Sequence, residues 1–158
     1  LEEILTPEIL KQREMEEMQK ADVAKAEGIA IAETVKTMLA DYKGKKLANL
    51  KKTASGLEYA IIEQGSGAAI KDGDNIPTHY YGVRKTDGVM FDNSFDRGAR
   101  AGFTVGALIP GFNEGMKLLN RGGKAILFIP SGLGYGERGA GADIPANTDL
   151  VFYIDMGM

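Results

Sequence analysis

The stretch from Leu108 to Met156 constrains the fold more than any other part of the sequence. Pro110 to Asn120 has the composition of a short helix, and the apolar run from Ala125 to Pro130 is typical of a buried strand. A glycine-rich loop continues to Pro145, and the residues up to Met156 predict a closing strand. This order predicts a short helix against an antiparallel sheet, with the long loop over one end of the sheet. We expect a functional site at that end.

The glycine-rich loop contains GYGERG from Gly134 to Gly139, which matches the G-x-G-x-x-G pattern of dinucleotide-binding proteins. That motif requires a helix that opens on its last glycine, so that the helix N-terminus can receive the pyrophosphate. Gly141, Asp143 and Pro145 follow instead, and no helix is expected there. Nucleotide binding is therefore disfavoured, and the glycines are more typical of positive-φ turns in a functional loop.

The sequence contains no other pattern for nucleophilic or metal chemistry. It has no Cys and a single His, His79, which lies in a strand-like run and is expected to be a packed or hydrogen-bonded strand residue. Cysteine nucleophiles, cysteine zinc sites and multi-histidine metal sites are thereby excluded, and we expect no metal and no cofactor. The C-terminal half is instead rich in aromatic and aliphatic side chains, which composition alone would assign to a core: Tyr80, Phe91, Phe103, Ile109, Phe112, Tyr135, Ile144 and Phe152.

The N-terminal part predicts one long helix. Thr6 and Pro7 form a start signal, with Thr as the N-cap and Pro at the first helical position. A helix of about 36 residues would be ~54 Å long, too long to be covered by a domain of this size. We therefore expect residues 1–50 to form a homodimerisation arm whose apolar face meets another helix. That face has a spacing of three and four residues: Met18, Ala21, Ala24, Gly28, Ile31, Val35, Met38 and Tyr42.

Residues 51–158 predict a separate domain of strands, which we expect to fold without the arm. Gly44 and the lysines after it indicate the end of the helix and a linker that reaches about Ser55. A strand is expected at 57–64, and Thr86-Asp87-Gly88 predicts a hairpin. The expected fold class is α+β, a bent antiparallel sheet wrapped on the short helix and preceded by the long helix.

Charge and hydropathy exclude some partners. The formal net charge is -3, and no basic face is evident, so nucleic acid is not expected as a partner. No apolar run approaches the ~18 residues that suggest a membrane span. The chain begins at Leu1 rather than Met, so its start is uninformative about a targeting segment.

Several motifs follow one another at fixed spacing between Lys52 and the C-terminus: SGLEY, HYYG, DG, FDNSFDRG, IPGFNEG, YGERGAG, IP and LVF. In this order they resemble the FKBP-type peptidyl-prolyl isomerases, the class that binds the macrolides tacrolimus and rapamycin. The resemblance covers about two-thirds of the chain. With its helical arm, the sequence is similar to the Mip- and FkpA-like bacterial subgroup, which implies a cell-envelope or periplasmic location rather than the cytoplasm.

The resemblance implies the residues of a proline-binding site. Phe112 would form the floor under the pyrrolidine ring, Tyr135 would donate its hydroxyl to the substrate carbonyl, and the Ile109 backbone N–H would hold the adjoining carbonyl. Asp92 would face the amide and orient polar neighbours, or else serve as a turn cap after the hairpin. The implied catalytic residues are Phe91, Asp92, Phe112 and Tyr135, and the implied substrate-binding residues are Tyr80, Leu108, Ile109, Ile144 and Phe152.

Some positions depart from the family pattern. The family usually has Trp at the position of Phe112, an apolar or small residue at Asp143, a second proline at Ala146 and an acidic residue at Tyr153. Because Phe112 lacks the indole of the usual Trp, the resemblance leaves the isomerisation rate and the macrolide affinity open. It bears less on the function itself.

The implied activity is faster rotation of X-Pro bonds in unfolded or partly folded polypeptides, and macrolides are the implied ligands. The alternative is a chaperone or binding protein that uses the same scaffold with little catalysis. Retention of the site residues favours the enzyme, whereas the Phe112 substitution leaves room for the alternative.

Overall fold

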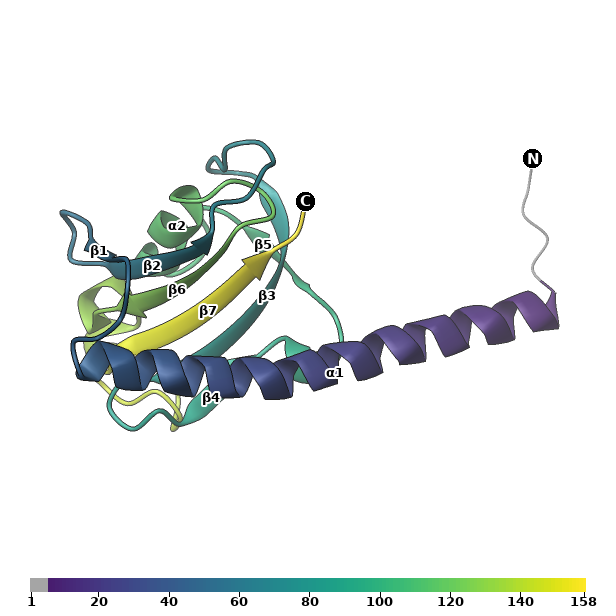
Figure 1. Ribbon diagram of the computed structural model, residues 1–158, viewed down its shortest axis with the longest axis horizontal. Helices are drawn as coiled ribbons and strands as arrows, with labels where there is room; N and C mark the ends of the chain where they lie inside the picture. Colours follow the sequence, from purple (N-terminus) through teal and green to yellow (C-terminus); the bar gives the residue numbers. More distant parts are fainter. Residues whose placement is uncertain (1–5) are drawn as a thin grey trace.

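The structure, a computed structural model, describes residues 6–158 as a long helix, an antiparallel sheet and a short helix, as the sequence predicted (Figure 1). The helices and strands are α1 (Pro7–Lys43), β1 (Leu50–Lys52), β2 (Glu58–Glu63), β3 (Asn75–Arg84), β4 (Met90–Asn93), β5 (Ala101–Thr104), α2 (Pro110–Lys117), β6 (Lys124–Ile129) and β7 (Leu150–Met156). Short 3-10 turns are η1 (Phe95–Arg97), η2 (Ser131–Leu133) and η3 (Gly136–Arg138).

The strands form one antiparallel sheet in the order β1-β2-β6-β7-β3-β4, and β5 pairs with the first part of β3. The sheet separates two hydrophobic clusters, because successive side chains of a strand point to opposite faces. On β6, Leu127 and Ile129 pack in the cluster that contains α2, whereas Ile126 and Phe128 pack in the cluster that contains α1. The two helices therefore cover opposite faces of the sheet (Figure 1).

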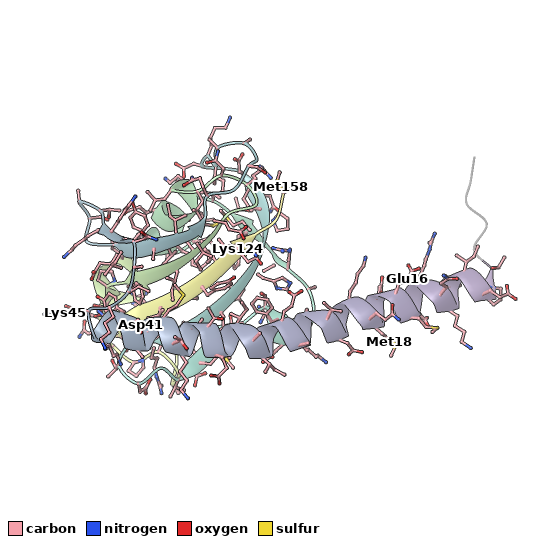
Figure 2. All side chains as sticks on the ribbon, viewed as in Figure 1. Glu16, Met18, Asp41, Lys45, Lys124 and Met158 are labelled. Carbon is pink, nitrogen blue, oxygen red and sulfur yellow. The ribbon has the colours of Figure 1, made fainter. Side chains whose placement is uncertain are left out.

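Helix α1 begins as the sequence predicted, since the Thr6 hydroxyl accepts a hydrogen bond from the Ile9 N–H at 3.2 Å. Every residue from 7 to 20 is exposed, and this part extends past the sheet, where Figure 2 shows Glu16 and Met18. The remainder lies on the sheet, with Val35 only 1% exposed. Residues 1–5 of the expected arm lie outside the described residues.

The partner of the apolar stripe differs from the expectation. From Ala24 onward the stripe covers the chain's own sheet rather than another helix. The physical reason is that this face of the sheet is itself apolar, with Phe128, Val151 and Tyr153 buried beneath the helix. Tyr42 closes the contact by stacking on Phe128 with the ring centroids 4.1 Å apart.

Two local expectations need correction. The linker expected up to Ser55 includes β1, an edge strand whose Leu50 pairs with Ala60 of β2. The expected helix to Asn120 ends at Lys117, because the last residues before Gly122 turn toward the next strand. Strand β1 also spans residues 50 and 51, between which the division into two domains is predicted.

Other expectations are confirmed. No α-helix opens after Gly139, and the glycines at 136, 139 and 141 have positive φ angles of 59, 66 and 69°. His79 is a buried strand residue that lies 2.7 Å from the Ser94 hydroxyl and stacks on Phe95. No helix within residues 6–158 is both long and apolar enough to cross a membrane.

Candidate functional site

A cleft of about 760 Å³ opens between the sheet, the N-terminal end of α2 and the glycine-rich loop. All nine residues that the family resemblance implied lie on its walls. The lining residues are Tyr80, Phe91, Asp92, Phe103, Ala107, Leu108, Ile109, Pro110, Phe112, Tyr135, Ala140, Asp143, Ile144 and Phe152. The cleft therefore brings together residues from β3, β4, β5, β7, α2 and two loops.

The floor of the cleft is a cluster of aromatic rings around Phe112, which is only 4% exposed. Phe112 meets Phe103 and Phe152 edge to face, with centroid distances of 5.2 and 5.1 Å. Phe91 is likewise edge-on to Phe152 at 5.4 Å. Edge-to-face pairs add roughly 0.5–1.5 kcal/mol to their burial, so this floor is stiff as well as apolar.

Asp92 belongs to a polar group on one side of this floor. Its carboxylate accepts a hydrogen bond from the Tyr80 hydroxyl at 2.6 Å and one from Arg97 at 2.9 Å. Arg97 also donates to the Tyr80 hydroxyl, and its guanidinium lies 5.6 Å from the centre of the Tyr80 ring. Burial, with a smaller effect of Asp92, raises the pKa of Tyr80, so this phenol stays protonated as a donor.

The loop before α2 presents a free backbone donor. The Asn113 side chain accepts from the N–H groups of Gly106 and Leu108 at 2.9 and 3.1 Å and donates to the Leu108 carbonyl at 2.9 Å. These bonds hold the loop on the first turn of α2. No acceptor for the Ile109 N–H is found among residues 6–158, so this donor is available to a ligand carbonyl.

The glycine-rich loop forms the opposite wall. Ala140 and Ile144 make an isolated antiparallel bridge, and the Asn147 N–H donates to the Gly136 carbonyl at 2.9 Å. Ile144 is buried toward the floor, whereas Tyr135 is 39% exposed at the rim. Within the part of the chain that the structure describes, the Tyr135 hydroxyl has no hydrogen-bond partner. It is therefore a second available donor.

Sequence reasoning missed two members of this site. Phe103 had been noted only as one of the aromatic residues, yet it packs against Phe112 in the floor. Arg97 had no assigned role, although it bridges Asp92 and Tyr80. The signal for Arg97 was the FDNSFDRG segment, where η1 and the left-handed Gly98 (φ 74°) turn the arginine back toward Asp92.

Chemically, the cleft offers an apolar floor with a few hydrogen-bond donors at its edge. Residues 6–158 contain no group of three or more His, Cys, Asp or Glu side chains that could hold a metal ion. No lining residue is a cysteine, serine or lysine that could act as a nucleophile. Such a site can bind, desolvate and orient a small apolar group and its flanking carbonyls.

The sequence of the chain is similar to those of known proteins of one family. Residues 66–157 match the family model for FKBP-type peptidyl-prolyl cis-trans isomerases. The chain is similar to the FKBP-type isomerase FkpA of Aeromonas hydrophila, with 46% identity over 111 residues that are 70% of this chain and 41% of the relative. It is also similar to a probable FKBP-type isomerase of Haemophilus influenzae, with 41% identity over 139 residues, 86% of this chain and 56% of the relative.

Among solved structures, the crystal structure of FkpA from Escherichia coli superposes with a TM-score of 0.69 at 34% sequence identity. The match covers 98% of this chain and 73% of that chain, so it includes the long helix. The chain spans about half the length of the curated relatives it matches.

Proposed function

Because the chain belongs to the FKBP-type peptidyl-prolyl cis-trans isomerase family, we propose that it accelerates rotation about X-Pro bonds in unfolded or partly folded polypeptides. The observation that carries the proposal is the cleft itself, in which the aromatic floor of Phe112, Phe103 and Phe152 faces two available donors. The proline ring would lie on Phe112, and the carbonyls on either side of it would meet Tyr135 and the Ile109 N–H.

The proposed mechanism needs no covalent intermediate. An X-Pro amide rotates slowly because it must lose resonance, with a barrier of ~18–20 kcal/mol. The twisted amide is less zwitterionic than the planar one, so transfer from water to an apolar cleft destabilises the planar ground state more than the transition state. Each ~1.4 kcal/mol of this difference raises the rate tenfold.

Asp92 would act by orientation. Its carboxylate is held by Tyr80 and Arg97, which fixes a polar side wall beside the rotating amide. Because the ion pair with Arg97 balances its charge, Asp92 can face the amide without adding an unpaired charge to the apolar floor.

A protease-coupled isomerisation assay on a short X-Pro peptide tests the proposal. We expect the full chain to accelerate the slow phase, and Phe91→Ala to reduce kcat/KM by about tenfold or more, because it opens one wall of the cleft. Ile62→Ala is the matched control, since Ile62 is an exposed apolar residue of β2 outside the cleft. A folded chain that binds the peptide without accelerating its isomerisation would favour the binding or chaperone alternative.

We also propose two finer properties. The cleft volume lies in the range of pockets that hold drug-sized ligands, which supports macrolides such as tacrolimus or rapamycin as ligands. The exposed apolar residues on the extending part of α1 support a homodimer through this helix: Ile9, Leu10, Met15, Met18 and Val23.

A further inference from the structure

We propose that Asp143 gives the cleft a preference for X-Pro bonds in which X is Lys or Arg. This inference names a substrate class for the isomerase function proposed above and rests on it. It starts from the charges on the cleft walls, where Asp92 and Asp143 are, among residues 6–158, the only lining residues with a formal charge.

The two carboxylates are in different electrostatic situations. Asp92 is balanced by Arg97 at 2.9 Å and hydrogen-bonded by Tyr80. Asp143 is exposed, and its side chain makes no hydrogen bond or ion pair with any residue between 6 and 158. A cation in the cleft would therefore find Asp143 free.

The cation that contacts Asp143, Arg84, does not cancel this charge. Arg84 attracts Asp143, but its guanidinium is already shared with the Asp87 carboxylate through contacts of 2.7 and 3.1 Å. Its remaining contact, at 3.2 Å, goes to the backbone carbonyl of Asp143 rather than to the carboxylate. Arg84 thus anchors the loop at Asp143 and leaves one uncompensated negative charge at the rim.

The position of this charge selects one flank of the proline. The floor at Phe112 is apolar and would hold the uncharged ring, so a charged substrate side chain must come from a neighbouring residue. Asp143 lies on the same loop as Tyr135, and of the two carbonyls that flank the proline we assign that of the rotating amide to Tyr135. That carbonyl belongs to residue X, so X is the flanking residue that would lie beside this loop, and we assign its side chain to Asp143.

The test measures exchange between the cis and trans forms of Ala-X-Pro-Phe peptides by NMR, with X as Lys, Leu or Glu. We expect kcat/KM to be about two- to fivefold higher for Lys than for Leu, and lower for Glu, since partly exposed ion pairs have effects of this size. The preference should shrink at high salt. Asp143→Asn should make kcat/KM similar for the three peptides. Asp143→Lys should make kcat/KM higher for the Glu peptide than for the Lys peptide.

Glu137→Gln is the control, because it removes the same charge from an exposed position on the same loop outside the cleft. This variant should keep the preference for Lys. Acceleration of all three peptides with ratios that Asp143→Asn leaves unchanged would overturn the specificity and spare the isomerase function. Failure of the parent chain to accelerate any peptide would overturn the isomerase function itself.

Discussion

Tyr135 is the residue at which binding can be separated from stability. Its ring lines the cleft, while its hydroxyl has no partner within residues 6–158. We expect Tyr135→Phe to weaken peptide and tacrolimus binding by about 0.5–1.5 kcal/mol, the net value of one hydrogen bond, and to leave the free energy of unfolding unchanged. Titration calorimetry and urea unfolding measure the two effects. Equal affinities for parent and variant would show that the hydroxyl does not meet the ligand.

His79 gives the chain a defined response to acid. Burial, followed by the nearby Arg100 charge, lowers the pKa of His79, whereas the unfolded chain should have a value of about 6.5. The unfolded state therefore binds the proton first as the pH falls. The stabilisation from neutral His79 is present above about pH 6.5 and is lost as the pH falls through the lower folded value.

We expect the urea midpoint to fall between pH 7 and pH 5, and His79→Gln to make this fall shallower. Because His79 is the single histidine, one imidazole resonance reports its titration directly. A folded-state titration at or above the unfolded value would contradict the expected sign.

At the scale of elements, the contact between α1 and η1 links the long helix to the site. A Cβ on Gly28 would lie 2.6 Å from the Cβ of Phe95, which is fully buried. Helix propensity favours Ala over Gly by about 1 kcal/mol, but overpacking a rigid contact costs about 1–3 kcal/mol. The steric cost is the larger, because Phe95 is wedged between the helix and His79.

We therefore expect Gly28→Ala to lower the free energy of unfolding by about 1 kcal/mol, although the same change stabilises most helices. It should also reduce isomerase activity, since η1 carries Arg97, which holds Asp92 and Tyr80. Ile29→Ala, one position along on the exposed face, serves as the control in thermal unfolding. Stabilisation by Gly28→Ala would mean that the helix is not seated on η1.

The C-terminal part of α1 behaves as a layer of the fold rather than as a separate arm. Val35 and Leu39 are buried in the same hydrophobic cluster as Phe128 and Val151, and burial of two such side chains contributes about 3–6 kcal/mol. Deletion of residues 1–50 should therefore destabilise the sheet strongly, unlike the independent domain that the sequence predicted. Deletion of residues 1–20 should have little effect on denaturant unfolding, because residues 7–20 are exposed. Similar midpoints for the two truncations would contradict this distinction.

The sequence predicted those features that have local chemical signals. Thr6 and Pro7 located the start of α1 because capping is decided within one turn of helix. The strand at Leu50–Lys52 was missed because it has only three residues, two of them lysines, and shows no alternation of apolar and polar side chains. It is identified only by its pairing with β2. The periodicity of α1 identified its apolar face but not the surface that covers it, because that surface is assembled from distant strands.

The residues of the cleft also divide into those with a signal in the sequence and those whose role depends on the folded chain. Its aromatic residues were visible in the sequence, but composition alone would have assigned them to a core, and only the ordered motifs indicated a site. Arg97 could not be placed, because its bond to Asp92 depends on the turn made by η1 and Gly98. The free charge of Asp143 likewise depends on Arg84 being held by Asp87, which spacing alone does not reveal.

At the scale of the whole molecule, the extending part of α1 leaves apolar side chains without cover. Met15 is 55% exposed, Met18 66% and Val23 57%. Figure 2 shows Met18 on the part of α1 that extends past the sheet. A lone helix with such side chains exposed is only marginally stable in water, and a second copy would bury some of them in both chains at once. The flexible methionine side chains would adapt to the partner helix.

We expect the full chain to sediment as a dimer at tens of micromolar and the chain without residues 1–20 to sediment as a monomer. The truncated chain should isomerise short peptides at nearly the parent rate, since the cleft receives no residue from this part of α1. It should nevertheless accelerate the refolding of a proline-limited protein less well, because two linked clefts raise the effective concentration of the second site. Met18→Asp is a milder variant that places a charge in the proposed interface. If the full chain and both variants all sediment as monomers, dimerisation through α1 is wrong.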